Sequence, residues 1–162
     1  MKLRKLAPAD APLMLEWMHD AEWVQYMQAD FAAKTLADCE AFVAAAQTDE
    51  TNLHRAIADD AGQYLGTVSL KHIDPTAKTA EFAITVRRGV PGAAAWGMQA
   101  MLCMGFEVLD LQSIYWCVAA ANARARRFYQ KQGYMPRSTV PDEHGLLWYQ
   151  VTREEQPCSS QK

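Results

Sequence analysis

The chain has 162 residues, of which 50% are hydrophobic and 22% charged, which is the composition of one globular domain large enough to bury a core. Its formal net charge of -3 argues against a general nucleic-acid-binding protein, which would carry a basic surplus. No apolar run approaches the ~20 residues that cross a bilayer, and the opening segment lacks the apolar stretch of a signal peptide. We therefore expect a cytoplasmic protein with no membrane or nucleic-acid partner.

The first half of the chain predicts one short strand, two helices and three further strands. The first strand covers residues 2–6, and a helix follows over residues 12–20, with Asp10 as its candidate cap. Apolar residues at helical spacing predict a second helix over residues 35–47. The apolar period then becomes two. Three consecutive antiparallel strands are predicted over residues 54–60, 63–73 and 79–88.

The second half predicts a helix, a strand, a second helix and a hairpin. A small-residue segment, GVPGAAAWG, leads into a helix of about a dozen residues. Residues 113–119 are β-branched and aromatic almost throughout, which is typical of a central strand covered on both faces. Asn122 is a candidate N-cap for a helix that ends at Gly133. The remaining elements are a hairpin over residues 134–140 and 146–152 and a polar, disordered tail over residues 155–162.

The cysteines and histidines form no recognisable metal or redox motif. They are Cys39, Cys103, Cys117, Cys158, His19, His54, His72 and His144. No pair has the spacing of zinc ligands or of a redox-active Cys-x-x-Cys motif. We therefore expect reduced thiols and no bound metal in one α+β domain over residues 1–154.

The segment between the strand at residues 79–88 and the next helix has the composition of an anion-binding loop. Its amides would point at a phosphate, and the N-terminus of the helix adds a favourable partial charge. The segment matches neither the Walker A motif nor the dinucleotide fingerprint. Taken alone, it fits a tight turn without a ligand equally well.

Two motifs together resemble the GNAT superfamily of N-acetyltransferases. VRRGVPGAAA resembles the family's pyrophosphate loop, Gln/Arg-x-x-Gly-x-Gly/Ala, at Gly89, Gly92 and Ala94. VAAANARARRFYQKQGY resembles the second signature, in which Asn-x-x-Ala precedes an apolar residue, a tyrosine and Gly-Phe or Gly-Tyr. The residues that match it are Asn122, Ala125, Phe128, Tyr129, Gly133 and Tyr134. The resemblance covers nearly the whole chain, because the two motifs also stand the usual distance apart.

This resemblance implies a fold, a co-substrate and a catalytic acid. The implied fold is a GNAT-like three-layer α+β fold, with a mixed, mostly antiparallel sheet of about six to seven strands flanked by about four helices. Acetyl-CoA is the implied co-substrate, with Ile84, Val86 and Asn122 at its pantetheine arm. Tyr129 would protonate the departing thiolate; the alternative is a core tyrosine whose hydroxyl is satisfied elsewhere.

The loop departs from the family pattern at one position. The family usually has Gln or Arg where this chain has Gly89, and Arg88 stands one residue earlier. Pro91 also lacks an amide that might donate. The loop residues expected at the pyrophosphate are Arg88, Gly89, Gly92, Ala93 and Ala94. Arg127 lies on a basic helix face that either meets the nucleotide phosphates or is merely solvated.

The acceptor side of the site is inferred from fewer residues. Glu81 stands where many members of this branch carry a glutamate base, although an outward-facing carboxylate is an equal alternative. His72 is a weaker candidate near the substrate. The segment LEWMHDAEWVQYM resembles a branch of amino-sugar nucleotide and ribosomal-protein N-terminal acetyltransferases. Within it Trp17, Trp23 and Tyr26 either wall an acceptor pocket or belong to the core.

Three functions are compatible with these residues. The first is an N-acetyltransferase that acts, as a monomer or homodimer, on a small-molecule amine such as an amino sugar. The second acts on a protein N-terminus or a polyamine. The third is an acyl-CoA-binding module without catalysis, against which the presence of both Tyr129 and Glu81 argues.

Overall fold

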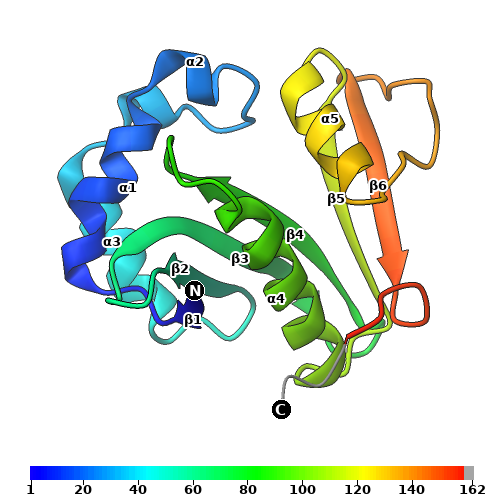
Figure 1. Ribbon diagram of the computed structural model, residues 1–162, viewed down its shortest axis with the longest axis horizontal. Helices are drawn as coiled ribbons and strands as arrows, with labels where there is room; N and C mark the ends of the chain where they lie inside the picture. Colours follow the sequence, from blue (N-terminus) through cyan, green and yellow to red (C-terminus); the bar gives the residue numbers. More distant parts are fainter. Residues whose placement is uncertain (159–162) are drawn as a thin grey trace.

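The computed structural model describes residues 1–158, which form one six-stranded sheet with helices on both faces (Figure 1). The strands, in sheet order, are β1 (Lys2–Arg4), β2 (Leu53–Ala58), β3 (Tyr64–Asp74), β4 (Thr79–Val86), β5 (Ser113–Ala119) and β6 (Leu146–Thr152). The helices are α1 (Ala11–Met18), α2 (Ala21–Val24), α3 (Leu36–Ala46), α4 (Ala93–Glu107) and α5 (Ala123–Lys131), with short 3-10 turns at Pro8–Asp10 and Phe31–Ala33. β4 and β5 run parallel, and the other neighbouring pairs run antiparallel. The predicted α+β architecture is confirmed, with α2 as an additional short helix.

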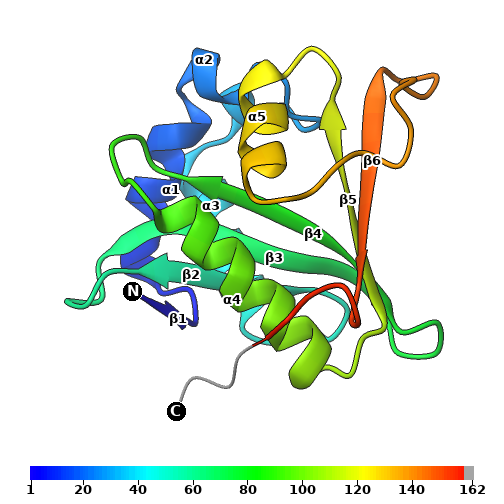
Figure 2. The same cartoon turned by 45° about the vertical axis from the view of Figure 1, so that its right-hand side comes forward.

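The helices cover the two faces of the sheet separately. α4 crosses one face against β3, β4 and β5, whereas α1 and α3 pack together over the opposite face (Figures 1 and 2). Val68 and Leu70 of β3 belong to the core beneath α4, and Tyr64 belongs to the core beneath α1 and α3. Alternation along a strand sends successive side chains to opposite faces. Tyr64 lies on the face opposite to Val68, although four residues separate them, because the β2–β3 register shifts between Ile57 and Ala58.

Glycines allow α4 to lie close to the sheet. A Cβ atom at Gly97 would overlap the Ile57 side chain, and one at Gly105 would lie 2.8 Å from Cδ1 of Ile114. These residues are weak helix formers, and each lowers the intrinsic helix stability by about 1 kcal/mol relative to alanine. Close packing of α4 on β2, β4 and β5 is the physical reason for their presence.

β4 and β5 pair only where both strands begin. The ladder joins Thr79 to Ser113, Ala80 to Ile114 and Glu81 to Tyr115. β4 then continues to Val86 without pairing to β5, and Figure 1 shows the strands diverging toward α2 and α5. The backbone groups on this side of β4 are left for other partners, because they have no ladder to join.

Two predicted strand features are wrong. Residues 134–140 form no strand; Pro136 has no N–H, and the Arg137 N–H donates to the Trp148 carbonyl as an isolated link to β6. β6 pairs along its length with β5 instead. β5 is also not covered on both faces, because its side chains alternate between buried and half-buried.

The C-terminal segment is tied to α4, which corrects two predictions. Cys103 and Cys158 form a disulfide across 55 residues of sequence, so these thiols are not reduced. Gln156 is buried and accepts a hydrogen bond from the Tyr134 hydroxyl, so the segment up to residue 158 is not a disordered tail. The fold brings the two cysteine Cα atoms to 5.5 Å, which spacing along the sequence does not reveal. The predicted tail beyond residue 158 lies outside the described residues.

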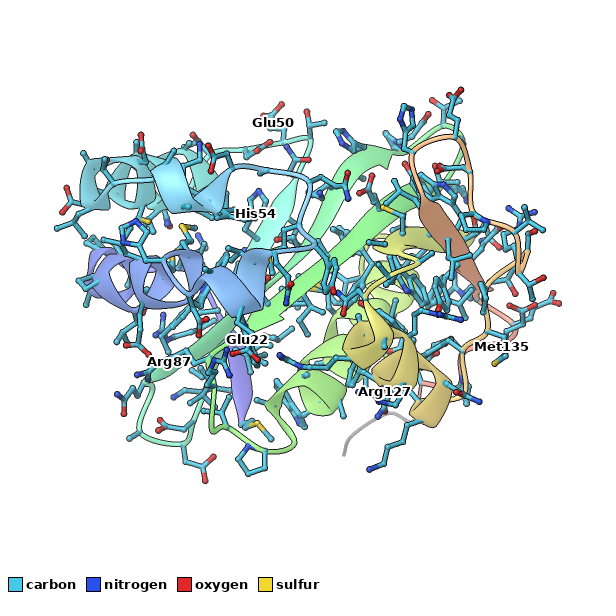
Figure 3. The ribbon with its side chains drawn as sticks, turned by 90° about the horizontal axis from the view of Figure 1, so that it is seen from above. Glu22, Glu50, His54, Arg87, Arg127 and Met135 are labelled. Carbon is cyan, nitrogen blue, oxygen red and sulfur yellow. A yellow bond between two sulfur atoms is a disulfide. The ribbon has the colours of Figure 1, made fainter. Side chains whose placement is uncertain are left out.

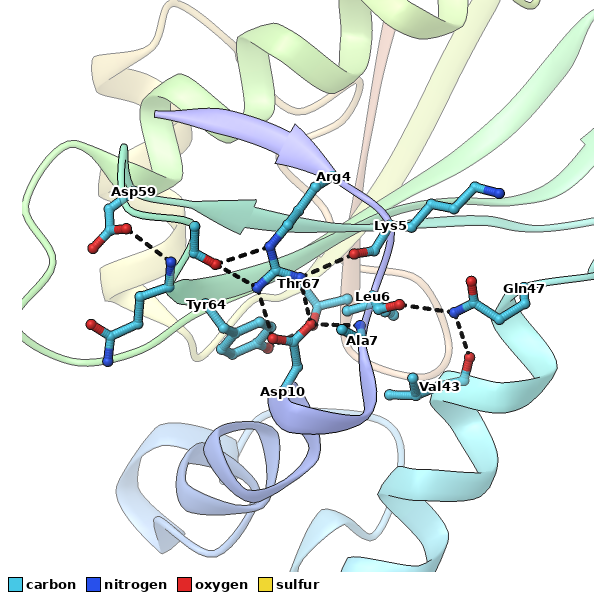
Figure 4. Close-up of polar contacts among 12 residues, drawn as sticks. Arg4, Lys5, Leu6, Ala7, Asp10, Val43, Gln47, Asp59, Tyr64 and Thr67 are labelled. Atoms are coloured by element: carbon cyan, nitrogen blue, oxygen red, sulfur yellow. Dashed lines mark hydrogen bonds and ion pairs between the residues drawn. The ribbon is translucent and has the colours of Figure 1, made fainter.

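A buried ion pair joins β1 to the start of α1 (Figure 4). Asp10, only 3% exposed, accepts hydrogen bonds from both terminal nitrogens of Arg4 at 2.8 Å and from the Ala7 N–H at 2.8 Å. Arg4 also donates to the Gly62 carbonyl, so its charge is well solvated by the protein. The sequence predicts that Asp10 caps α1, but its carboxylate makes no capping hydrogen bond. The carboxylate is instead occupied by Arg4 and by the Ala7 N–H.

Candidate active site

The end of β4 separates two cavities. The larger, of about 520 Å³, lies between β4, α5 and α2, and we call it the β4–α5 cleft. The smaller, of about 250 Å³, lies beneath α1 and α3 on the other face of the sheet, and we call it the α1–α3 pocket. Ile84 and Thr85 line both cavities. A group bound in one cavity can therefore meet a group bound in the other at this point of β4.

The loop from β4 to α4 brings small residues to one side of the cleft. Gly89 and Gly92 have φ angles of 74° and 80°, which residues other than glycine rarely adopt. Ala94 borders the cleft and is half-buried. Ala93 does not fit its predicted role, because its side chain is buried and its N–H already donates to the Val90 carbonyl. After Ala93, the backbone amides of residues 94 and 95 have no acceptor within α4, because the first intrahelical bond runs from Trp96 to Gly92.

The two arginines predicted to contact phosphates lie apart from one another. The Arg88 side chain lies against α2, where its guanidinium pairs with Asp20 at 2.5 Å and with Glu22 at 3.1 Å. The pKa of Asp20 is lowered by this hydrogen bond. Arg127 is exposed on α5 (Figure 3). Among residues 1–158, neither guanidinium makes a hydrogen bond or ion pair with the N-terminus of α4.

Trp23 of α2, predicted for an acceptor pocket or the core, lines the β4–α5 cleft and not the α1–α3 pocket. Its indole N–H donates to the Val86 carbonyl at 2.9 Å. The guanidinium of Arg124, from the first turn of α5, lies 3.3 Å from the centroid of the indole ring, and that of Arg88 lies 4.6 Å from it. These contacts connect the unpaired end of β4 to α5. Burial and the neighbouring Arg88 charge lower the pKa of Arg124.

α5 places its predicted residues at the floor of the cleft. The Asn122 side chain accepts from the Ala125 N–H at 3.1 Å, which confirms the predicted N-cap, and Gly133 ends the helix region with a φ of 94°. Tyr129 lines the cleft with only 8% of its surface exposed. Burial, with Tyr149 and Cys117 nearby, raises the pKa of Tyr129 well above its usual value. The hydroxyl is therefore held protonated.

The α1–α3 pocket gathers side chains from alternate positions of three strands. His54, Ser69 and Ala83 are cross-strand neighbours on β2, β3 and β4, and all line the pocket. Trp17 lies in its wall, as predicted, and also donates its indole N–H to the buried Tyr64 hydroxyl at 3.1 Å. Tyr26, by contrast, lines the β4–α5 cleft.

Glu81 lies beside the pocket, and His72 lies outside both cavities. The Glu81 carboxylate is 3.4 Å from Nζ of Lys71, which lines the pocket, and its side chain is 20% exposed. Burial raises the pKa values of Tyr115 and Cys117, and the nearby Glu81 charge raises them further. His72 is exposed at an irregular point of β3 with a φ of 51°. It therefore has no place in either cavity.

His54 is the histidine that the pocket contains, and sequence reasoning did not select it. Its Nδ1 lies 2.6 Å from the Ser69 hydroxyl, and its ring meets that of Phe42 edge to face. Burial lowers the pKa of His54. The available signal was alternation, because His54 shares a strand face with Ala56, a residue of the core under α1 and α3.

The part of the chain that the structure describes contains no cluster of three or more His, Cys, Asp or Glu side chains able to hold a metal ion. Across residues 1–158, no helix is long and apolar enough to cross a membrane.

Comparisons with known proteins agree with this geometry. Residues 1–135 match the family model described as an acetyltransferase (GNAT) domain. The fold resembles that of a spermidine N-acetyltransferase from Vibrio cholerae in complex with CoA and spermine, with a TM-score of 0.81, 19% identity and 96% of each chain covered. It also resembles a structure described as a probable acetyltransferase, with a TM-score of 0.76, 19% identity and coverage of 94% of this chain and 93% of that one. No curated protein sequence matches the chain.

Proposed function

The chain belongs to the GNAT family of acetyl-CoA-dependent N-acetyltransferases, and we propose that it transfers the acetyl group to the primary amine of a small molecule by direct attack in a ternary complex. The observation that carries this proposal is the junction of the two cavities at Ile84 and Thr85. A thioester in the cleft and an amine in the pocket would meet there, and this proximity supplies much of the rate enhancement. A covalent route through Cys117 is disfavoured, because burial raises the pKa of that thiol and keeps it protonated.

The β4–α5 cleft has the features that acetyl-CoA requires. Ala94 and the residue after it can offer amides to the pyrophosphate, and the small loop residues let a phosphate approach the backbone. Asn122 lines the same cleft, where its side chain can face the pantetheine arm. The Val86 carbonyl would become available to pantetheine when Trp23 releases it, since the indole N–H holds it in this structure.

Two side chains are proposed to move protons during the reaction. Glu81 would take a proton from the attacking amine through water, because its carboxylate adjoins the pocket at Lys71 and does not line it. Tyr129 would donate its proton to the departing thiolate. Its raised pKa keeps the hydroxyl protonated at neutral pH, so the proton is present when the carbon–sulfur bond breaks, but the same shift makes the phenol a weaker acid than a free tyrosine.

The proposed acid is tested with a matched pair of tyrosine variants. Tyr129→Phe keeps the ring and removes the hydroxyl, so we expect kcat to fall by about 10²–10⁴ while acetyl-CoA affinity is kept. Tyr149→Phe removes a hydroxyl from the same aromatic cluster, where the two rings lie 5.4 Å apart, without lining the cleft. It should leave kcat almost unchanged. Parental turnover in Tyr129→Phe, with chemistry shown to limit the rate, would return Tyr129 to a packing role.

The sequence resemblance and the similar structures suggest two candidate classes of acceptor amine. The first segment of the sequence resembles enzymes that act on amino-sugar nucleotides, and the similar V. cholerae structure is that of a spermidine N-acetyltransferase holding spermine. Thiol release from acetyl-CoA in the presence of each amine measures which acceptor is used. The lining of the α1–α3 pocket narrows the choice further.

A further inference from the structure

Most of the α1–α3 pocket is lined by apolar side chains. α1 contributes Met14, Trp17 and Met18, and two phenylalanines, Phe31 and Phe42, complete the wall. The Trp17 and Phe31 rings meet edge to face with their centroids 5.2 Å apart. Such a surface favours an apolar ligand, because binding removes the apolar surfaces of both the ligand and the pocket from water.

Four polar side chains of this wall, Trp17, His54, Thr67 and Ser69, are already paired within the protein. The Trp17 indole N–H donates to the Tyr64 hydroxyl, which lies 2.6 Å from the Thr67 hydroxyl. The Ser69 hydroxyl lies 2.6 Å from Nδ1 of His54. A ligand with many hydroxyl groups would lose its hydrogen bonds to water and find few replacements, which is unfavourable. The pocket is therefore poorly suited to an amino sugar.

The charged groups of the pocket do not suit a polyamine either. Asp38 is the carboxylate among the lining residues, and it accepts from the backbone N–H and the hydroxyl of Thr35 at 2.8 and 3.0 Å. Two cations, Lys34 and Lys71, line the same pocket. A spermidine molecule that presents one amine to the junction would carry its remaining ammonium groups past these lysines. Those ammonium groups would find no uncommitted carboxylate among the described residues here, because Thr35 engages Asp38 and Lys71 pairs with Glu81 at the edge of the pocket.

The dimensions of the pocket limit the ligand to a short body. Its volume of about 250 Å³ is below the roughly 300–1,000 Å³ of drug-sized sites. It extends across the strands from Ala83 on β4 to His54 on β2, two strand spacings or roughly 10 Å. This length accommodates one ring and a short arm.

We propose that the acceptor is a compact hydrophobic primary amine that carries a single positive charge and an aromatic or similarly bulky apolar group. The amine lies at Thr85, and the apolar group lies between Trp17, Phe31 and Phe42. This inference rests on the proposed acetyl transfer and adds the class of substrate to it.

The direct test compares three amines as acceptors. The rate of thiol release from acetyl-CoA is measured with 2-phenylethylamine, spermidine and glucosamine. We expect kcat/KM to be at least about tenfold higher for 2-phenylethylamine than for either of the others. A preference for spermidine or glucosamine would overturn this inference and leave the acetyl transfer intact.

Calorimetric binding separates failure of the pocket assignment from failure of the catalytic proposal. Each amine is titrated into the protein saturated with coenzyme A. Binding of 2-phenylethylamine alone supports the inference even if no amine is acetylated, in which case the proposed function fails. Equal or tighter binding of spermidine or glucosamine contradicts the inference whatever the turnover shows.

A charge variant tests the reason given for excluding polyamines. Lys34→Glu changes an exposed side chain at the pocket and keeps the backbone carbonyl that pairs with His19. We expect the ratio of kcat/KM for spermidine to that for 2-phenylethylamine to rise severalfold. Lys5→Glu makes the same charge change at an exposed position outside both cavities and should leave the ratio unchanged. An unchanged ratio in Lys34→Glu would refute the electrostatic part of the inference.

Discussion

The buried pair of Arg4 and Asp10 provides a sharp test of how the first helix is held. Asp10→Ala leaves the Arg4 guanidinium without its carboxylate and leaves the Ala7 N–H without its acceptor. Breaking a buried pair from one side typically costs about 3–5 kcal/mol of unfolding free energy. The Arg4 side chain is 24% exposed and keeps the Gly62 carbonyl, so we expect the lower end, about 3 kcal/mol. The change should lower Tm by about 6–12 °C in a chain of this length.

Two further variants separate the charge from the geometry. Asp10→Asn keeps an acceptor for the Ala7 N–H and loses the charge, so we expect a smaller loss, of about 2 kcal/mol. Arg4→Met combined with Asp10→Ala removes both charges, and it should be less destabilising than the sum of the single changes.

The assay is urea unfolding at neutral pH, followed by far-ultraviolet circular dichroism. The slope with denaturant is checked for two-state behaviour. Loss of less than about 0.5 kcal/mol in Asp10→Ala would refute the reasoning, because it would mean that the pair contributes nothing beyond its desolvation. Strictly additive changes in the double variant would refute the coupling between the two residues.

Two other predictions concern the disulfide and the pocket histidine. Cys103→Ser opens a loop of 55 residues, so unfolding free energy in oxidising buffer should fall by up to about 4 kcal/mol, while parent and variant should converge once a thiol reductant is added. Cys117→Ser is the matched control, and a Cys103→Ser protein as stable as the parent in oxidising buffer would contradict the prediction. His54 has a folded-state pKa below the unfolded value of about 6.5, so the unfolded chain binds its proton first and stability should fall as pH drops below that value. Denaturant midpoints of the parent and His54→Gln between pH 7.5 and 5 measure this, and equal slopes for the two proteins would show that His54 is not the titrating group.

Most of the elements could be predicted from the sequence because their signals are local. Asn122 caps a helix through the N–H three residues later, and this contact depends only on neighbouring residues. The change of apolar period from three or four to two marks the transition from α3 to β2 in the same way. The composition of residues 134–140 predicts a strand, but Pro136 has no N–H to donate, and the segment makes one isolated bond, from Arg137, to the outer edge of β6.

The candidate site was predicted in part. Tyr129, Asn122 and Ala94 all line the β4–α5 cleft, and Trp17 lines the α1–α3 pocket. Their positions follow from motifs or helical spacing. His72 lies outside both cavities, where the β3–β4 register shifts between Lys71 and Asp74, whereas His54 pairs with Ser69 inside the α1–α3 pocket.

The sequence by itself determined the order and type of most elements, the glycine loop before α4 and the residues of the α5 motif. The tertiary structure alone decided which distant groups meet. Arg88 pairs with Asp20 across 68 residues, Trp23 donates to Val86 across 63, and Cys103 joins Cys158 across 55. Local propensity acts over about one helical turn or one strand neighbour, whereas these contacts arise when the burial of apolar faces brings α2, β4 and α4 to their places. The partners of a charged or polar side chain are therefore set by how the layers pack, and that packing is not written in any short segment.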